Sequence, residues 1–409
     1  MFLLYIDPGT GSMLLSLFIG IATAGIFGLR ALFIKLQFIF SGGKINKDSF
    51  SESLPYVIFS DHKRYWNVFK PICDEFEKRK EKLVYYTCSP DDPALQAKYE
   101  HIKAEYIGEG NKAFAKLNMV HADILIATTP NLDVYQWKRS KNVKYYVHIP
   151  HSADELAGYR MFGLDYYDAV LTTGQNQNEL IRKIESLRPK IAKKELVTIG
   201  SITLDNLKKR YDSVSHNVKN EKPVVLLAPS WGASGILSKY GEKLLNALSK
   251  TDFKIIIRPH PQTVVSEQNI LKPLQQAFQN IEWNFDNDNF EVLNKSDVII
   301  TDFSGIIFDF SCVFDKPVIY ADTSFDTLPY DADWLDEKRW SFKVLPEIGI
   351  ELNEQDFGNI QSVIETALSS KNLQNGRNKV RSECWENIGN SVSKAVDYLI
   401  SKERELKND

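Results

Sequence analysis

"KIIIRPHPQTV", residues 254–264, places a β-branched apolar run directly before an arginine, a histidine and two prolines. A continuous apolar run of this kind indicates a strand that is buried on both faces, as in a parallel sheet. Proline cannot donate to a strand ladder, so Pro259 and Pro261 indicate that the strand ends there. Arg258 and His260 therefore follow the carboxyl end of a strand, which is where open α/β sheets bind their ligands.

Runs of the same kind recur along the chain in two series, separated by longer amphipathic stretches. The first series predicts strands at 56–61, 82–88, 122–129, 144–150, 169–174 and 196–201. The second predicts strands at 223–230, 253–260, 281–285, 297–303 and 317–322, with helical spacing between them, as at 263–280. The second half of the polar stretch 204–223 is expected to be a linker. Two such series predict a doubly wound α/β protein with two Rossmann-like domains facing a cleft.

The composition is that of a globular protein with more than one domain. The chain has 409 residues, of which 43% are hydrophobic and 25% are charged. Its 50 Lys and Arg against 53 Asp and Glu lack the basic excess of a general nucleic-acid binder. The four cysteines are far apart in sequence and have no metal-ligand spacing. We therefore expect reduced thiols, no disulfide framework and no metal held by protein ligands.

The N-terminal region differs from the rest of the chain. Residues Met13–Leu29 carry no charge, and a helix over them would be about 26 Å long, close to a hydrocarbon core of about 30 Å. Asp7 precedes this run and Arg30 follows it, the reverse of a signal peptide. The positive-inside rule then places the body of the protein in the cytoplasm. We expect an N-terminal transmembrane helix, or an interfacial helix that does not span.

Histidines follow a predicted strand in each of the two series. In "VHIPHSADE", residues 147–155, His148 lies inside the strand and His151 lies past its end, so we prefer His151 as the cleft residue. His260 occupies the matching place in the second series. Histidine, with an unperturbed pKa of about 6.5, can move protons near neutrality. A structural role in a strand-end turn is the alternative for either ring.

Two other strand ends also carry polar residues. "LLAPSWGASG", residues 226–235, and "IITDFSGIIFDF", residues 299–310, both follow apolar runs. Ser304 and Gly305 would begin a helix over 305–314, whose free N–H groups and dipole attract an anion. The alternative is that Ser304 or Asp302 only caps that helix. Asp309 lies among apolar neighbours and needs a partner if it is buried.

These motifs resemble those of the CDP-glycerol glycerophosphotransferase family, the teichoic acid primases and polymerases. The resemblance covers roughly residues 50–390 and rests on "RPHP", "TDFSGIIFDF", "APSW" and "IGSITLDNL". It implies a GT-B fold with a membrane-associating N-terminal region. It also implies transfer of glycerol phosphate or ribitol phosphate from a CDP-alditol to a hydroxyl of a wall polymer, with release of CMP. The sequence departs from the family at "IPHSADE", which replaces a Trp-His-Gly-Thr setting, and at Gly305, which replaces the second serine of a Ser-Ser pair.

The resemblance and the strand-end pattern together lead to the following roles and boundaries along this chain. It implies that His151 and His260 are catalytic. The residues expected to bind the donor are Arg258, Ser230, Trp231, Asp302, Ser304, Gly305 and Asp309. The expected organisation is a membrane anchor at 1–45, an acceptor domain at 46–215, a CDP-alditol-binding domain at 216–385 and a C-terminal helix at 386–409.

The expected partners are CDP-glycerol or CDP-ribitol, a lipid-linked acceptor and the inner membrane, with the catalytic body on its cytoplasmic face. No nucleic acid and no cofactor are expected. The sequence indicates neither a divalent cation requirement nor an oligomeric state. Two alternatives are a GT-B glycosyltransferase that uses a UDP-sugar in surface polysaccharide synthesis and a non-catalytic envelope-assembly scaffold.

Overall fold

A computed structural model describes residues 53–214, 221–286, 288–321 and 326–408 of the chain. The expected anchor at 1–45 lies outside these residues, as does part of the expected linker, at 215–220. Within the described ranges, no helix has both the length and the apolar character needed to cross a membrane. Residues Leu54–Asp409 form one compact unit, which contains two parallel sheets.

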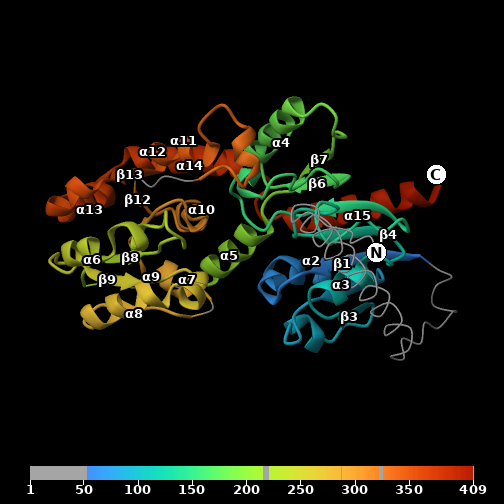
Figure 1. Ribbon diagram of the computed structural model, residues 1–409, viewed down its shortest axis with the longest axis horizontal. Helices are drawn as coiled ribbons and strands as arrows, with labels where there is room; N and C mark the ends of the chain where they lie inside the picture. The colour runs from blue at the N-terminus through green and yellow to red at the C-terminus, as the bar shows by residue number, and fades with distance from the viewer. Residues whose placement is uncertain (1–52, 215–220, 287, 322–325, 409) are drawn as a thin grey trace, which may run out of the picture. The chain divides into compact units, whose positions relative to one another are not determined.

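The first sheet has seven strands in the order β3-β2-β1-β4-β5-β6-β7, and each neighbouring pair is parallel (Figure 1). Its strands are β1 (Leu54–Ser60), β2 (Leu83–Thr87), β3 (Ile102–Tyr106), β4 (Ala122–Ala127), β5 (Val143–His148), β6 (Ala169–Thr172) and β7 (Glu195–Thr198). The helices between them are α2 (Trp66–Lys78), α3 (Asn111–Leu117) and α4 (Gln175–Leu187), and α5 (Ile202–Ser213) follows.

The second sheet has six strands in the order β10-β9-β8-β11-β12-β13, also parallel throughout. Its strands are β8 (Val224–Leu227), β9 (Lys254–Ile257), β10 (Glu282–Trp283), β11 (Val298–Thr301), β12 (Val318–Ala321) and β13 (Gly349–Leu352). The associated helices are α6 (Ile236–Leu248), α7 (Pro261–Ser266), α8 (Gln268–Ala277), α9 (Phe290–Lys295), α10 (Ile306–Phe308), α11 (Trp340–Lys343), α12 (Leu345–Ile348), α13 (Ile360–Ser369) and α14 (Asn372–Cys384).

Both sheets are buried on both faces, as the continuous apolar runs predict. Along β1, Tyr56 and Ile58 belong to one apolar cluster, whereas Val57 and Phe59 belong to another. The strands of the second sheet divide in the same way between two further clusters. The prediction of an α/β protein with two doubly wound parallel sheets is therefore confirmed.

The strand order changes direction between β1 and β4 in the first sheet and between β8 and β11 in the second. In a doubly wound sheet, the carboxyl ends of the strands at this switch point border the ligand site. Phe59 pairs with Ala127, and Leu227 pairs with Ile300, at the ends of these strands. The residues that follow these two pairs of strands are consequently the first places to look for a site.

The sequence pattern did not predict two of the strands or one break in a helix. Strands β3 and β13 lack a continuous apolar run, because several of their side chains are partly or fully exposed. The helix expected over 263–280 is divided into α7 and α8 at Glu267, whose backbone is not helical. Short or half-exposed elements give a weak periodic signal in the sequence. The low burial of β3 and β13 therefore explains why these strands were not predicted.

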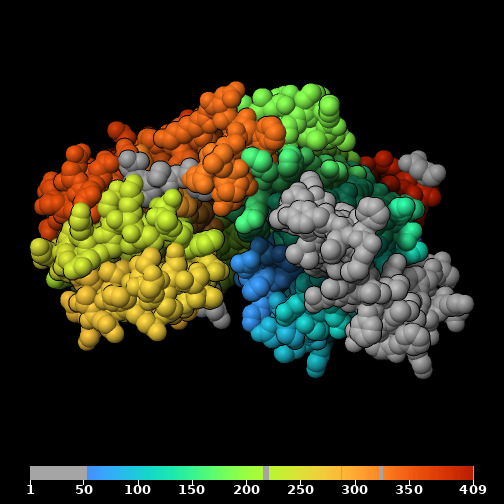
Figure 2. All heavy atoms as spheres, viewed as in Figure 1, coloured from blue at the N-terminus to red at the C-terminus, as the bar shows by residue number. Residues whose placement is uncertain are grey.

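The C-terminal part of the chain returns to the first sheet. Helix α15 (Ser391–Asn408) packs against α2, β4 and α5, and Figure 1 shows it beside these elements. Two contacts also join the first sheet's loops and helices to the segment before α11. Met161 N donates to Pro329 O at 3.1 Å, and Lys183 on α4 pairs with Glu337. Figure 2 shows the orange spheres of this later segment against the green spheres of α4. The two sheets are thus joined by several separate passages of the chain.

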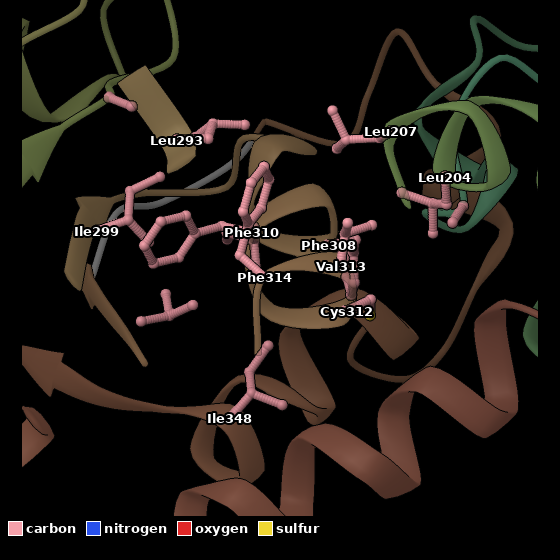
Figure 3. Packing of buried hydrophobic residues seen from close by; sticks show 14 of the residues in the cluster. Leu204, Leu207, Leu293, Ile299, Phe308, Phe310, Cys312, Val313, Phe314 and Ile348 are labelled. Carbon is pink, nitrogen blue, oxygen red and sulfur yellow. The ribbon is translucent and has the colours of Figure 1, made fainter. Parts of the chain in front are cut away.

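One apolar cluster supports the helical segment that follows β11. Phe308, Phe310 and Val313 pack with Leu204 and Leu207 of α5 (Figure 3). In the same cluster, the buried free thiols of Cys312 and Cys384 have their sulfur atoms 3.9 Å apart, although the two residues are distant in sequence. This packing fixes the place where that helical segment begins.

Candidate active site

His151 lies just past the end of β5, on the carboxyl edge of the first sheet. Its ring centroid is 5.1 Å from that of Tyr65, and its Nδ1 is a buried atom without a hydrogen-bond partner among the described residues. Burial, together with the positive charge of Arg64, lowers the pKa of His151 to about 4. The ring is therefore neutral at physiological pH and can accept a proton at an atom that is free to do so.

His148, three residues earlier, has a different setting. It is fully buried at the end of β5, and its Nε2 lies 2.9 Å from Tyr159 Oη. Burial lowers the pKa of His148 to about 3. This residue supports the packing behind His151, in keeping with its position inside the strand.

His260 follows β9 on the carboxyl edge of the second sheet and caps α7. Its Nδ1 accepts a hydrogen bond from Gln262 N at 3.1 Å, so the neutral ring carries its proton on Nε2. Burial lowers the pKa of His260, and the charge of Arg64 lowers it further. The Trp231 ring lies 6.5 Å away, centroid to centroid. His260 thus presents an Nε2–H donor beside an aromatic side chain.

Arg64 connects the two histidines. Its charge lowers the pKa of His151 from the first sheet and of His260 from the second. A second link joins the edges directly, because a Cβ placed on Gly305 would lie 3.4 Å from Ser152 Oγ, next to His151. The two carboxyl edges are therefore close at Ser152 and Gly305, whereas the pairing of the two histidines stays a prediction.

Asp302, at the switch point of the second sheet, accepts hydrogen bonds from the backbone of its own chain. Both of its carboxylate oxygens lie 3.0 Å from Ser230 N, and its Oδ2 also accepts from Ile236 N at 2.9 Å. Gly232, between them, has a φ of +93°, a conformation that favours glycine. Asp302 therefore shapes the 230–236 loop, which presents Trp231 with 51% of its surface exposed.

The helical segment after β11 begins at Ile306, with Gly305 as the capping residue. No side chain makes a cap hydrogen bond there, so neither Ser304 nor Asp302 is a simple helix cap. The segment continues from α10 into a π-helical turn, η5 (Asp309–Val313). Such turns inside helices are frequent at functional sites.

Arg258 points its guanidinium at its own chain. Its Nη1 donates to Asn284 Oδ1, and its Nη2 donates to the Asp286 carbonyl at 2.8 Å. Burial lowers the pKa of Arg258. Its role in binding a phosphate stays a prediction.

Asp309 makes the stability of the folded chain depend on pH. Burial raises its pKa to about 7, and a hydrogen bond from Asn289 only partly opposes this. The unfolded pKa of an aspartate is about 3.9, so the folded state binds more protons between that pH and about pH 7. Stability should therefore fall as pH rises through this window. We expect Asp309→Asn to reduce that loss by at least about 1 kcal/mol between pH 5.5 and 8.5, measured by urea unfolding.

The matched control for this measurement is Asp252→Asn, at an exposed position. Its pH dependence of stability should follow that of the wild type. Parallel curves for Asp309→Asn and the wild type would show that Asp309 does not titrate in this window.

The sequence prediction missed Asp61, Arg64 and Thr129. Asp61 and Arg64 follow β1 in "SDHKRY", and Thr129 follows β4. Each comes after a continuous apolar run, so the same strand-end signal that selected His260 was present. What was missing was the strand order, which places β1 beside β4 at the switch point.

Residues 61–333 match the family described as CDP-Glycerol:Poly(glycerophosphate) glycerophosphotransferase, a span of well over half of the chain. The chain belongs to this family. It is thus a CDP-glycerol glycerophosphotransferase-like enzyme of teichoic acid synthesis, and its donor is CDP-glycerol. The family match does not favour the UDP-sugar glycosyltransferase or the scaffold. No curated protein sequence matches the chain.

Solved structures with the same fold include the wall teichoic acid polymerase TagF. One TagF structure, of a histidine-to-alanine variant, is 16% identical and covers 92% of this chain and 98% of its own, with a TM-score of 0.57. Another, a histidine-to-asparagine variant with CDPG, is 15% identical over 86% of this chain and 89% of its own, with a TM-score of 0.55. The S. aureus MnaA–UDP structure is 14% identical over 88% and 98%, with a TM-score of 0.55.

At these identities the likeness concerns the fold. It supports an α/β protein with parallel sheets similar to those of GT-B enzymes. The domain boundaries at 45, 215 and 385 and the roles of the individual site residues stay predictions.

Proposed function

We propose that the enzyme transfers glycerol phosphate from CDP-glycerol to a hydroxyl of a lipid-linked wall polymer, and that His151 and His260 carry the reaction. The observation that supports these roles is the closeness of the two edges, because a Cβ placed on Gly305 after β11 would lie 3.4 Å from Ser152 Oγ, next to His151. We also propose that the protein works at the cytoplasmic face of the inner membrane, held there by its N-terminal residues.

In the proposed step, the acceptor oxygen attacks the phosphorus that carries glycerol. A new P–O bond forms, the bond to the departing CMP breaks, and CMP leaves with the electron pair. His151 Nδ1 accepts the proton of the attacking hydroxyl. His260 donates a hydrogen bond from Nε2–H to the departing phosphate, whose charge Arg64 also stabilises. Positioning and electrostatics provide most of the rate in phosphoryl transfers of this kind.

The low histidine pKa values refer to the protein without its substrates. A bound diphosphate brings negative charge, which favours the protonated ring and raises a histidine pKa. His151 would therefore become a better proton acceptor when CDP-glycerol is bound. Ser304 and Gly305 at the start of α10, with Ser230 and Trp231 on the facing loop, would hold that donor.

Arg64 should set the acid limit of the activity. In the free enzyme His151 must be neutral to accept a proton, and its pKa is about 4, so the acid limb of kcat/KM should lie well below pH 6.5. In Arg64→Gln, the loss of the positive charge raises the pKa of both histidines, and the acid limb should move to higher pH. Rates measured between pH 3.5 and 8 test this shift, because this range includes the wild-type limb near pH 4.

Lys103→Gln, on strand β3, is the charge-matched control and should leave the limb in place. An acid limb that keeps its pH while the rate at the optimum falls would mean that Arg64 only binds substrate. Such a result would remove the electrostatic link between the two edges.

The function itself is tested by incubating membranes that contain the full-length protein with CDP-glycerol, CDP-ribitol or a UDP-sugar, and a lipid extract. Release of CMP with incorporation of glycerol phosphate supports the proposal, whereas release of UDP from the UDP-sugar would overturn it. Parallel reactions with EDTA and with Mg²⁺ test for a divalent cation. Recovery of the full-length protein in the soluble fraction without detergent would contradict the membrane location.

A further inference from the structure

His151 Nδ1 belongs to a group of polar atoms of which the other two have no role in the step above. Asp61 Oδ1, Thr129 Oγ1 and His151 Nδ1 are each buried without a hydrogen-bond partner in the described part of the chain. They follow β1, β4 and β5, three adjacent strands of the first sheet. We refer to these three atoms as the orphan cluster.

Several contacts place the members of this cluster together. Phe59 pairs with Ala127, which brings Asp61 and Thr129, each two residues further on, to the same edge. Burial raises the pKa of Asp61, and the Arg64 charge and the Thr129 hydroxyl partly oppose this, although Asp61 Oδ1 and Thr129 Oγ1 meet no hydrogen-bond geometry. The Tyr65 ring lies 5.1 Å from that of His151, and the charge of Asp61 adds to the effect of burial in raising the pKa of Tyr65.

Unsatisfied buried polar atoms are uncommon, because each one loses its hydrogen bonds to water without a replacement. Two neighbouring atoms on the same edge, Thr128 Oγ1 and His148 Nδ1, also lack a partner among the described residues. By contrast, the Thr129 carbonyl accepts from Tyr167 Oη at 2.5 Å, and His148 Nε2 lies 2.9 Å from Tyr159 Oη. Asp61, Thr129 and His151 are only partly buried as whole residues, whereas the three unpaired atoms are buried, so these side chains must rotate for a ligand to reach the atoms. Three unpaired atoms at one switch point therefore indicate a missing polar ligand.

The chemistry of the cluster selects an uncharged, hydroxyl-rich ligand. A carboxylate oxygen accepts hydrogen bonds, a threonine hydroxyl donates or accepts, and the free Nδ1 of a neutral histidine accepts. An anion would meet the carboxylate of Asp61 as well as the charge of Arg64, so the net charge gives an anion no advantage, and a single carboxylate is a poor set of ligands for a metal ion. Two neighbouring hydroxyl groups, as in the end of a polyol, match the cluster.

We propose that the orphan cluster is the subsite for the terminal polyol of the acceptor, with His151 on the attacking hydroxyl and Asp61 and Thr129 on the hydroxyl beside it. This inference rests on the proposed function, since it assigns the attacking hydroxyl to His151. It makes Asp61 and Thr129 specificity residues, which recognise an acceptor that ends in a vicinal diol.

The test compares two synthetic acceptors, a glycerol phosphate oligomer that ends in glycerol and the same oligomer ended by 1,3-propanediol, which lacks the neighbouring hydroxyl. With the wild type, kcat/KM should be about tenfold or more higher for the glycerol-ended acceptor. Asp61→Asn and Thr129→Val should each lower kcat/KM by about that factor for the glycerol-ended acceptor. Neither variant should change kcat/KM appreciably for the other acceptor. The dissociation constant for CDP-glycerol, measured by calorimetry, should stay unchanged.

The controls are Asp252→Asn and Thr366→Val, two exposed positions away from both sheet edges that should keep the acceptor preference. Equal losses on both acceptors, or no loss on either, would overturn the inference while CMP release still supports the proposed function. A wild type that releases no CMP would instead overturn both. If a variant does not fold, the preference of the wild type still decides, because equal rates with the two acceptors contradict the subsite.

Discussion

Replacing His260 by alanine is expected to lower kcat for glycerol phosphate transfer by about 10²–10⁴-fold. The Nε2–H of this ring is the donor that faces the departing CMP in the proposed step, and its tautomer is fixed by the Gln262 N–H on Nδ1. The fold should survive, because His260 caps only the six-residue helix α7 and lies at the edge of its sheet. Initial rates of CMP release with saturating CDP-glycerol measure the effect.

His151→Ala should cause a loss of similar size, and the double variant should be little worse than either single one. Groups that act in one chemical step are not additive when they are removed. His101→Ala is the matched control, since this histidine precedes β3 at the amino end of the first sheet and pairs with Glu77. Retention of more than a tenth of wild-type kcat by His260→Ala would mean that the ring only shapes the turn after β9.

The strand-end histidines and the fold were both predictable from the sequence for one physical reason. A parallel sheet that is covered on both faces requires continuous apolar runs, and the polar residues that end those runs face the ligand edge. His260 after "KIII" and His151 after "YYVHIP" follow from that rule alone. Strand β13 did not, because two of its four residues are at least partly exposed and leave no continuous run.

The partners of the site residues were less predictable, since they depend on contacts between distant segments. Arg64 lies far from both histidines in sequence, and only the strand order places it near them. Asp302 and Arg258 occupy the expected strand ends, yet their side chains bond mainly to their own chain. A sequence shows which residue types reach an edge, whereas the geometry decides whether each one serves the ligand or the loop that holds it.

Asp302→Ala should therefore weaken both the fold and the binding of CDP-glycerol. The buried N–H groups of Ser230 and Ile236 lose their acceptor, and each unsatisfied donor costs about 1–3 kcal/mol, so we expect a loss of about 3 kcal/mol in the free energy of unfolding. The 230–236 loop should then move, and with it Trp231. The expected kinetic result is a KM for CDP-glycerol raised about tenfold or more, with a smaller fall in kcat.

Urea unfolding and donor saturation curves measure these two effects, with Asp252→Ala as the control at an exposed position. Asp302→Asn provides a second comparison. Its amide keeps the size of the side chain but has one accepting oxygen, where the carboxylate has two. It should fall between the wild type and Asp302→Ala in both measurements. If Asp302→Ala instead abolishes kcat without changing stability, the carboxylate contacts the substrate directly and does not hold the loop.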